Sequence, residues 1–364
     1  MTYLTRKFKN TYTKNDASHS ESVNFQFHIA PSNNQPRIRQ LPKPLEIKKP
    51  PVYDQHTGVI LSMATIMNRV ESFFEIIDSI DSIDRVFKVI IHLCKTYKRF
   101  NTEVADKDLK AVHEHPIIQR LNAKHGYDKY VVHIVDDLGP ITKLIGVYQY
   151  AVQNKYTESK IVIIDDDTEY LDNCVTELVK YKTPDNIVSG SGFLFYENRN
   201  FTVLDETGSK KGTLNRADIV EGFSGICFQY SDLDPRFMQF VHYYRAIHWN
   251  IQVDEASEYH YRINTFLKAC FLGDDFVISY YYGKKKKLYK VFGFIDSIKQ
   301  QGYGYGADAL HQNTVFQSNN GSYVFIYEHI YFFDALLARV DLCRHIREFG
   351  SFVLRRKHNH KHKK

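Results

Sequence analysis

An uninterrupted apolar run that ends in three aspartates most constrains how this 364-residue chain can fold. Residues 161–164 (IVII) are all β-branched with no polar residue between them, which predicts a strand buried on both faces of a parallel sheet. Asp165, Asp166 and Asp167 follow directly. Three carboxylates at one strand end repel one another, so the run favours a site for a hard divalent cation with oxygen ligands. An acidic turn that caps the next helix is the alternative that this run alone leaves open.

Apolar strands and helical spacing alternate along the chain from residue 57 onward. Further strands are predicted at 59–61, 86–93 and 130–135, and helical spacing at 69–80, 141–152 and 175–179. This alternation predicts an α/β fold with a mainly parallel sheet flanked by helices. A later helix is expected to begin at Asp274 or Asp275 and to end at Gly283. The polar segment 98–126 receives no assignment.

Composition divides the chain into three parts. Residues 1–55 are polar and then proline-rich, which is typical of a disordered or loosely docked extension, and 56–350 are expected to form the folded domain. Residues 351–364 form a tail rich in Lys and His, whose basic residues account for the formal net charge of +6. The domain itself is therefore close to neutral, and no nucleic-acid surface is expected on it. The tail is interpreted as a mobile end, and peripheral membrane contact through it stays open.

The remaining composition indicates a soluble cytoplasmic protein. The five cysteines are scattered without a C-x-x-C pair, which argues against a disulfide framework and for a reducing compartment. The first residues contain no apolar signal segment. No apolar run reaches the roughly 18 residues that a membrane-spanning helix needs.

Two basic residues are placed where an anion could bind. Lys143 follows Gly139-Pro140 in the first turn of a predicted helix, where free amides and the helix dipole favour an anion. Arg69 follows the first strand, so it is expected at the same sheet edge as the aspartates and could bind a diphosphate with two hydrogen bonds. The alternatives are a lysine that points to solvent and a surface arginine. The glycine patterns of dinucleotide and P-loop sites are absent from the sequence.

Three further segments have two interpretations each. Asp274-Asp275 either caps a helix or supplies a general base aimed from a rigid helix end. Residues 221–225 (EGFSG) form either a loop of close backbone approach or a simple turn. Residues 302–310 (GYGYGADAL) form either a flexible loop whose aromatic rings stack on a sugar or base, or a tight surface turn.

Four segments in order resemble the metal-dependent, nucleotide-sugar glycosyltransferases of the GT-A fold. The closer resemblance is to a family 2-like branch found in bacteria and large DNA viruses. The segments are TIMNR (65–69), DLGPITKL (137–144), the aspartate triplet and DDFVIS (274–279). The similarity covers about residues 57–315. Met67 departs from the family pattern, which usually has proline there, and this affects the stiffness of the loop more than its chemistry.

The resemblance implies a GT-A (Rossmann-like) fold and a role for each matched residue. The implied donor-binding residues are Thr65, Arg69, Asp137, Lys143, Asp165 and Asp166, the implied ligands of Mn²⁺ or Mg²⁺ are Asp167 and Asp165, and the implied catalytic residues are Asp275 as base and Asp274 beside it. The implied reaction is an inverting transfer of a hexose or deoxyhexose from a nucleoside diphosphate, such as UDP, to a hydroxyl. The acceptor would be a glycan or a lipid- or protein-linked sugar. No histidine is matched to an additional metal-ligand role.

Two other functions remain as alternatives. A two-metal phosphoryl-transfer enzyme acting on nucleic acid would also use clustered aspartates. Two observations argue against this enzyme. The carboxylates form one tight cluster and a pair about 110 residues later, and the folded domain lacks the excess of basic residues that binding of nucleic acid needs. A catalytically inactive sugar- or nucleotide-binding module is the second alternative, and it is weakened because every expected acidic position is present.

Overall fold

The computed structural model describes residues 53–195, 201–203, 212–242, 247–249, 252, 257–291, 293–294, 298–300, 326 and 328–339. The chain divides into Met1–Pro50 and Pro51–Lys364, and all described residues belong to the second unit. The predicted extension lies outside the described residues except for 53–55, and the tail at 351–364 and the loop at 302–310 lie outside them entirely.

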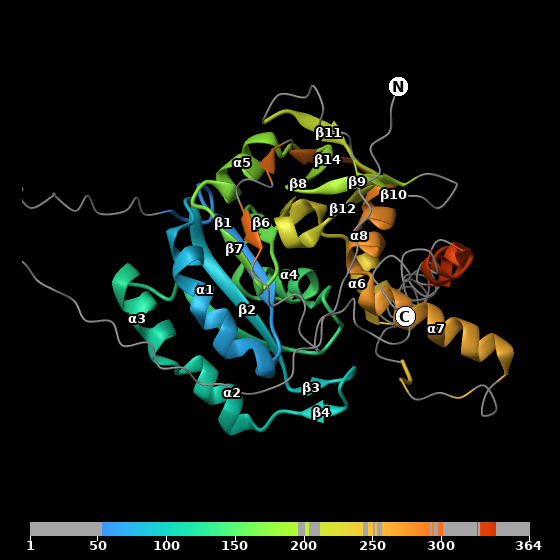
Figure 1. Ribbon diagram of the computed structural model, residues 1–364, viewed down its shortest axis with the longest axis horizontal. Coiled ribbons are helices and arrows are strands. Elements are labelled where there is room, and N and C mark those ends of the chain that lie inside the picture. The colour runs from blue at the N-terminus through green and yellow to red at the C-terminus, as the bar shows by residue number, and fades with distance from the viewer. Residues whose placement is uncertain are drawn as a thin grey trace, which may run out of the picture. The chain divides into compact units, whose positions relative to one another are not determined.

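An eight-stranded sheet forms the centre of the described unit, in the order β11-β14-β8-β13-β6-β1-β2-β5 (Figure 1). Its strands are β1 (Val59–Ala64), β2 (Val86–Cys94), β5 (Tyr130–Val135), β6 (Lys160–Ile163), β8 (Asn186–Ser189), β11 (Leu214–Arg216), β13 (Ile226–Gln229) and β14 (Lys287–Val291). Strands β5, β2, β1 and β6 pair in parallel, as do β8 and β14. Strand β13 runs antiparallel to both β6 and β8, and β11 is antiparallel to β14. The predicted α/β class with a mainly parallel sheet is confirmed.

Smaller sheets and helices surround this sheet. The short strands are β3 (Thr96–Tyr97), β4 (Thr102–Glu103), β7 (Thr168–Tyr170), β9 (Gly192–Phe195), β10 (Phe201–Val203), β12 (Ile219–Val220) and β15 (Ile298–Gln300). The labelled helices are α1 (Val70–Ser82), α2 (Asp106–His113), α3 (Pro116–His125), α4 (Thr142–Asn154), α5 (Cys174–Tyr181), α6 (Pro235–His242), α7 (Glu258–Leu272) and α8 (Asp274–Gly283), and residues 330–339 are helical as well. Segment 98–126, which the sequence left unassigned, contains β4, α2 and α3. Helices α4 and α8 begin where the sequence predicted.

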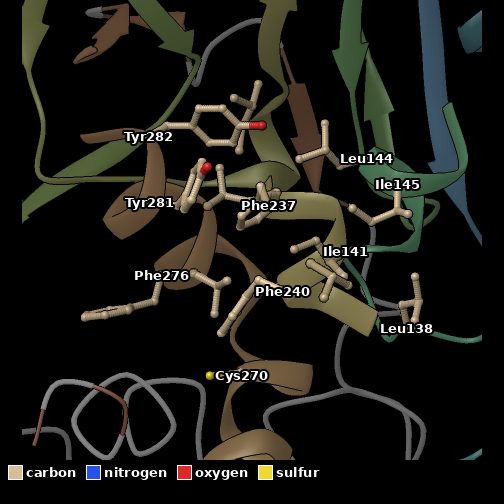
Figure 2. Close-up of a cluster of buried hydrophobic side chains, with 14 of the residues drawn as sticks. Leu138, Ile141, Leu144, Ile145, Phe237, Phe240, Cys270, Phe276, Tyr281 and Tyr282 are labelled. Carbon is tan, nitrogen blue, oxygen red and sulfur yellow. The ribbon is translucent and has the colours of Figure 1, made fainter. Parts of the chain in front are cut away.

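The strand before the aspartate triplet is buried on both faces, as predicted. Each of the residues 161–164 is at most 1% exposed. Because side chains alternate along a strand, Ile161 and Ile163 join the apolar layer beneath α4, α6, α7 and α8, whereas Val162 and Ile164 join the layer beneath α1, α2, α3 and α5. Figure 2 shows the first layer, in which side chains around α4 lie beside those of α6 and α8.

The strand order creates a switch point between β1 and β6. From β1 the chain proceeds outward to β2 and β5 on one side, and it then returns to form β6 on the other side. In open α/β sheets, ligands bind outside the carboxyl ends of the strands at such a point. None of the helices in the described ranges is both long and apolar enough to cross a membrane.

Candidate active site

The switch point gathers the residues that the sequence singled out. Arg69 follows β1, the aspartate triplet follows β6, Lys143 lies in the first turn of α4, and Asp274 and Asp275 open α8. Ion pairs of Arg69 and Lys143 with these aspartates join the four segments into one site.

Arg69 binds two of the three aspartates. Its Nη2 atom lies 2.8 Å from Asp166 Oδ1 and 2.8 Å from Asp167 Oδ2. Burial raises the pKa of Asp166 to about 6, although the Arg69 charge opposes this rise. Burial and the neighbouring charge of Asp165 also raise the pKa of Asp167, again against Arg69. The alternative of a surface arginine is therefore wrong, because this guanidinium is part of the carboxylate cluster.

Lys143 joins the triplet to the second acidic pair. Its side chain is 4% exposed, and its Nζ lies 2.5 Å from Asp165 Oδ1 and 3.4 Å from Asp274 Oδ2. Burial alone would lower the pKa of Lys143, but the carboxylates of Asp165, Asp274 and Asp275 raise it well above its usual value. The side chain therefore stays an ammonium ion. A lysine that points to solvent, the alternative interpretation, is excluded.

Asp274 and Asp275 do not cap α8. The N-cap residue is Gly273, and both aspartates lie in the first turn. Burial raises the pKa of Asp275 well above its usual value, and the charge of Asp274 adds to the rise. Burial raises the pKa of Asp274 as well, while Lys143 opposes it. Because Gly273 is the cap, the capping interpretation is wrong for these two aspartates. The role of Asp275 as a general base stays a prediction, and a raised pKa is a property that such a group commonly has.

The loop at 221–225 makes the close approach that was one of its two predicted interpretations. The amide of Gly222 donates a hydrogen bond to Asp275 Oδ1 at 2.9 Å. A Cβ atom on Gly222 would lie 2.8 Å from Lys143 Nζ and 3.1 Å from Asp275 Oδ1. Only glycine leaves room here for both side chains, so the loop forms a wall of the site.

Thr65 lies beside Asp166 of this cluster, whereas the hydrogen bonds of Asp137 belong to the turn that precedes α4. Thr65 directly follows β1 and is 4% exposed. The carboxylate of Asp137 accepts hydrogen bonds from the amides of Lys98 (2.8 Å) and Gly139 (2.9 Å). Asp137 therefore holds the turn that leads into α4 and Lys143. Its predicted contact with the donor stays a prediction, and the structure adds this positioning role.

Sequence reasoning missed Tyr170, which also belongs to the site. Its hydroxyl donates to the carbonyl of Phe223 at 2.7 Å and accepts a hydrogen bond from the amide of Asp165 at 3.1 Å. No local signal could have identified this residue, since a buried tyrosine after a strand is most often part of the core. Its polar role comes from the turn at Asp165 together with the approach of the 221–225 loop.

The carboxylates present fit a hard divalent cation that shares its ligands with a substrate. Asp165 and Asp167 keep side-chain exposures of 34% and 24%, and both supply oxygen donors. Within the described ranges no group of three His, Cys, Asp or Glu side chains is arranged to hold a metal ion. Mg²⁺ is commonly held by one or two carboxylates together with water and substrate phosphates, and Mn²⁺ also suits carboxylate oxygens. The predicted metal therefore stays a prediction that this donor set allows.

The chain is only distantly similar to the known proteins with which it was compared. No family model matches the sequence, and a search of curated proteins finds no match. Among solved structures, the chain is similar to the galactosyltransferase LgtC in complex with donor and acceptor sugar analogs, with 13% identity over 48% of this chain and 58% of that chain and a TM-score of 0.28. It is also similar to the glycosyltransferase GlyE of Streptococcus pneumoniae TIGR4, with 10% identity over 72% of this chain and 51% of that chain and a TM-score of 0.35.

A third similar structure is the bifunctional glycosyltransferase WbbM, with 15% identity over 55% of this chain and 36% of that chain and a TM-score of 0.29. The alignments span less than two thirds of each of these three solved chains. At such TM-scores a shared function does not follow from the similarity, so the chemistry of the site has to carry the functional conclusion.

Proposed function

We propose that this protein is a metal-dependent glycosyltransferase that moves a sugar from a nucleoside diphosphate to a hydroxyl group. One observation carries the proposal. The partly exposed carboxylates of Asp165 and Asp167 are suited to a metal ion. Lys143 separates them from a second carboxylate, that of Asp275, whose pKa is raised well above its usual value. Both groups lie at the switch point of the sheet, where ligands of α/β folds bind.

The donor half of the site would bind the nucleoside diphosphate. Asp165 and Asp167 would hold Mn²⁺ or Mg²⁺, which when bound acts as a Lewis acid that neutralises the leaving diphosphate. Arg69 and Lys143 bring two fixed positive charges to the same sheet edge. They would share the phosphate oxygens as negative charge develops on the leaving group. Thr65, Asp137 and Asp166 would line or shape the nucleotide pocket.

The acceptor half would activate the incoming hydroxyl. Asp275 would take the proton as the acceptor oxygen forms its bond to the anomeric carbon and the bond from that carbon to the diphosphate breaks. A single displacement of this kind inverts the anomeric configuration. Asp274 would act indirectly, because its charge raises the pKa of Asp275 and its carboxylate pairs with Lys143.

The proposal extends to partners and location. The acceptor would be a glycan or a lipid- or protein-linked sugar, the transferred sugar a hexose or deoxyhexose, and the site of action the cytoplasm. Peripheral membrane contact through 351–364 belongs to the same proposal, although that tail lies outside the described residues.

The test is a panel of nucleotide sugars incubated with the purified protein and Mn²⁺. We expect slow hydrolysis of one donor, detected as free nucleoside diphosphate, and loss of this activity in Asp167→Ala. Asp106→Ala is the matched control, because Asp106 is an exposed aspartate whose ion pair is with Lys95 and with none of the residues of the site. Absence of both turnover and metal-dependent nucleotide binding across the panel would contradict the proposal. Salt-dependent binding of DNA or RNA would favour the nucleic-acid alternative instead.

A further inference from the structure

One buried hydroxyl joins the two halves of the site. Tyr170 ends the short strand β7, which follows the aspartate triplet, and its side chain is packed in the apolar layer beneath α1 and α5. The residue is only 2% exposed. Its backbone pairs with Ile298 of β15, which fixes the strand that carries it. The ring is therefore held rigidly, with its hydroxyl at the edge of the site.

The hydroxyl satisfies two backbone groups that have left the sheet. The ladder between β1 and β6 ends where the amide of Ile164 donates to Ser62 O at 2.9 Å. The next amide, that of Asp165, donates instead to the Tyr170 hydroxyl at 3.1 Å. The hydroxyl in turn donates its only hydrogen to the carbonyl of Phe223 at 2.7 Å. Buried backbone groups require such partners, so the first bond holds the backbone at Asp165 and the second holds the 221–225 loop next to it.

Phe223 belongs to the loop that holds the proposed base. The preceding residue, Gly222, donates its amide to Asp275 Oδ1. The following residue, Ser224, donates its hydroxyl to Glu221 O at 3.0 Å, which closes the loop on itself. A continuous chain of contacts therefore leads from Asp165 through Tyr170 and the loop to Asp275.

We infer that Tyr170 is a positioning residue that fixes the separation between the metal-binding carboxylates and Asp275, an inference that rests on the proposed function. The bond that does this crosses 53 residues of sequence. Groups that react across a site lose efficiency steeply when they are misplaced by about 1 Å.

The test is Tyr170→Phe, which keeps the ring and removes both hydrogen bonds. Donor hydrolysis at saturating donor should fall about ten- to hundred-fold. Binding of nucleoside diphosphate with Mn²⁺ should change less than about three-fold, because the side chains of Arg69, Lys143 and Asp167 are untouched. Tyr130→Phe is the matched control, since its buried hydroxyl binds Asp81 at 2.9 Å in a cluster separate from the site. It should lower thermal stability similarly and leave hydrolysis unchanged.

Hydrogen exchange tests the bridge without any turnover. In Tyr170→Phe, amides in 164–170 and 221–225 should exchange about five-fold faster together, whereas Tyr130→Phe should leave both segments unchanged. Unchanged exchange in these segments, or a loss of hydrolysis no larger than in Tyr130→Phe, would overturn the inference. If the wild-type protein shows no turnover, but Tyr170→Phe still speeds exchange in both segments, the proposed function is contradicted and the bridge itself is established.

Discussion

Two buried carboxylate clusters in this molecule have opposite charge balance. In the first, Asp81 on α1 meets Lys124 at 2.6 Å, His125 at 2.6 Å and Lys129 at 3.4 Å, and Tyr130 donates a further hydrogen bond. Burial acts to raise the pKa of Asp81, but these partners hold it well below its usual value. One carboxylate therefore faces two lysine ammonium groups.

The candidate active site has the reverse balance. Five aspartates, at 165–167 and 274–275, meet the cations Arg69 and Lys143, and the pKa values of Asp166, Asp167, Asp274 and Asp275 are all raised. The Asp81 cluster is electrostatically complete and ties α1 to α3 and β5. The aspartate site gains stability only when more positive charge or protons arrive, which is the condition of a functional site.

Asp275→Asn should lose most of the activity if the aspartate site is functional and the Asp81 cluster is structural. The amide keeps the oxygen that accepts from Gly222 but cannot take a proton. Donor turnover should therefore fall about 10²- to 10⁴-fold. Thermal stability should stay equal or increase, because the repulsion between Asp275 and Asp274 is removed. Steady-state kinetics and thermal unfolding of the same preparations measure both quantities.

The wild-type protein should also show a pH dependence that reflects the raised pKa of Asp275. Since the pKa of Asp275 is raised, the activity should increase with pH along an acid limb well above the usual aspartate range, and Asp275→Asn should lack that limb. If Asp275→Asn is destabilised and keeps full turnover, Asp275 has a structural role like that of Asp81, and the two clusters do not differ in function.

A smaller effect, on stability alone, is expected for Asp81→Asn. Removing this carboxylate leaves Lys129, which is 4% exposed at its side chain, without its buried counter-charge. We expect a loss of about 3 kcal/mol in the free energy of unfolding at pH 7. Turnover per folded molecule should not change. Denaturant unfolding and kinetics on the folded fraction provide the measurements.

The sign of the pH effect on Asp81 follows from its depressed pKa. Its stabilising contribution is complete above the unfolded value of about 3.9 and is lost as pH falls below it, so the variant and the wild type should converge in that acidic range. A variant as stable as the wild type at pH 7 would show that the cation-rich cluster is not a structural tie.

A smaller change is expected from His92, which is buried and whose ring lies beside a serine and a second histidine. Its Nε2 lies 3.0 Å from Ser62 Oγ, and its Nδ1 lies 3.3 Å from Nδ1 of His133. Burial, followed by the charge of His133, lowers the pKa of His92 well below its usual value. The folded state therefore keeps His92 neutral, and its contribution to stability should be complete above the unfolded pKa of about 6.5 and decline as pH falls.

Thermal unfolding between pH 7.5 and 5.5 measures this contribution. The wild type should lose up to about 1.4 kcal/mol per pH unit below pH 6.5 from this one group, and His92→Asn should lose less. His56→Asn is a suitable control, since its side chain is 55% exposed. Equal acid sensitivity of the wild type and His92→Asn would show that His92 titrates normally.

Local patterns predicted much of this fold and of its site. The β-branched run at 161–164, the Gly139-Pro140 break before α4 and the start of α8 are all signals that a few neighbouring residues supply, and the structure contains each element. The same signals could not assign α2 and α3, whose mean hydropathy is low and whose apolar residues are few. They also could not place β13 antiparallel between β6 and β8, because pairing partners are not encoded by the period of a strand.

Short-range periodicity and turn chemistry place aspartates and basic residues at the ends of β1 and β6 and at the starts of α4 and α8. The partners of these residues depend on contacts between distant parts of the chain. Lys143 pairs with Asp165 and Asp274, Gly222 approaches Asp275, and Tyr170 binds the 221–225 loop, all across chain separations of more than 20 residues. Packing of helices on both faces of the sheet brings these groups together, and burial then raises the pKa values that distinguish the site from an acidic turn.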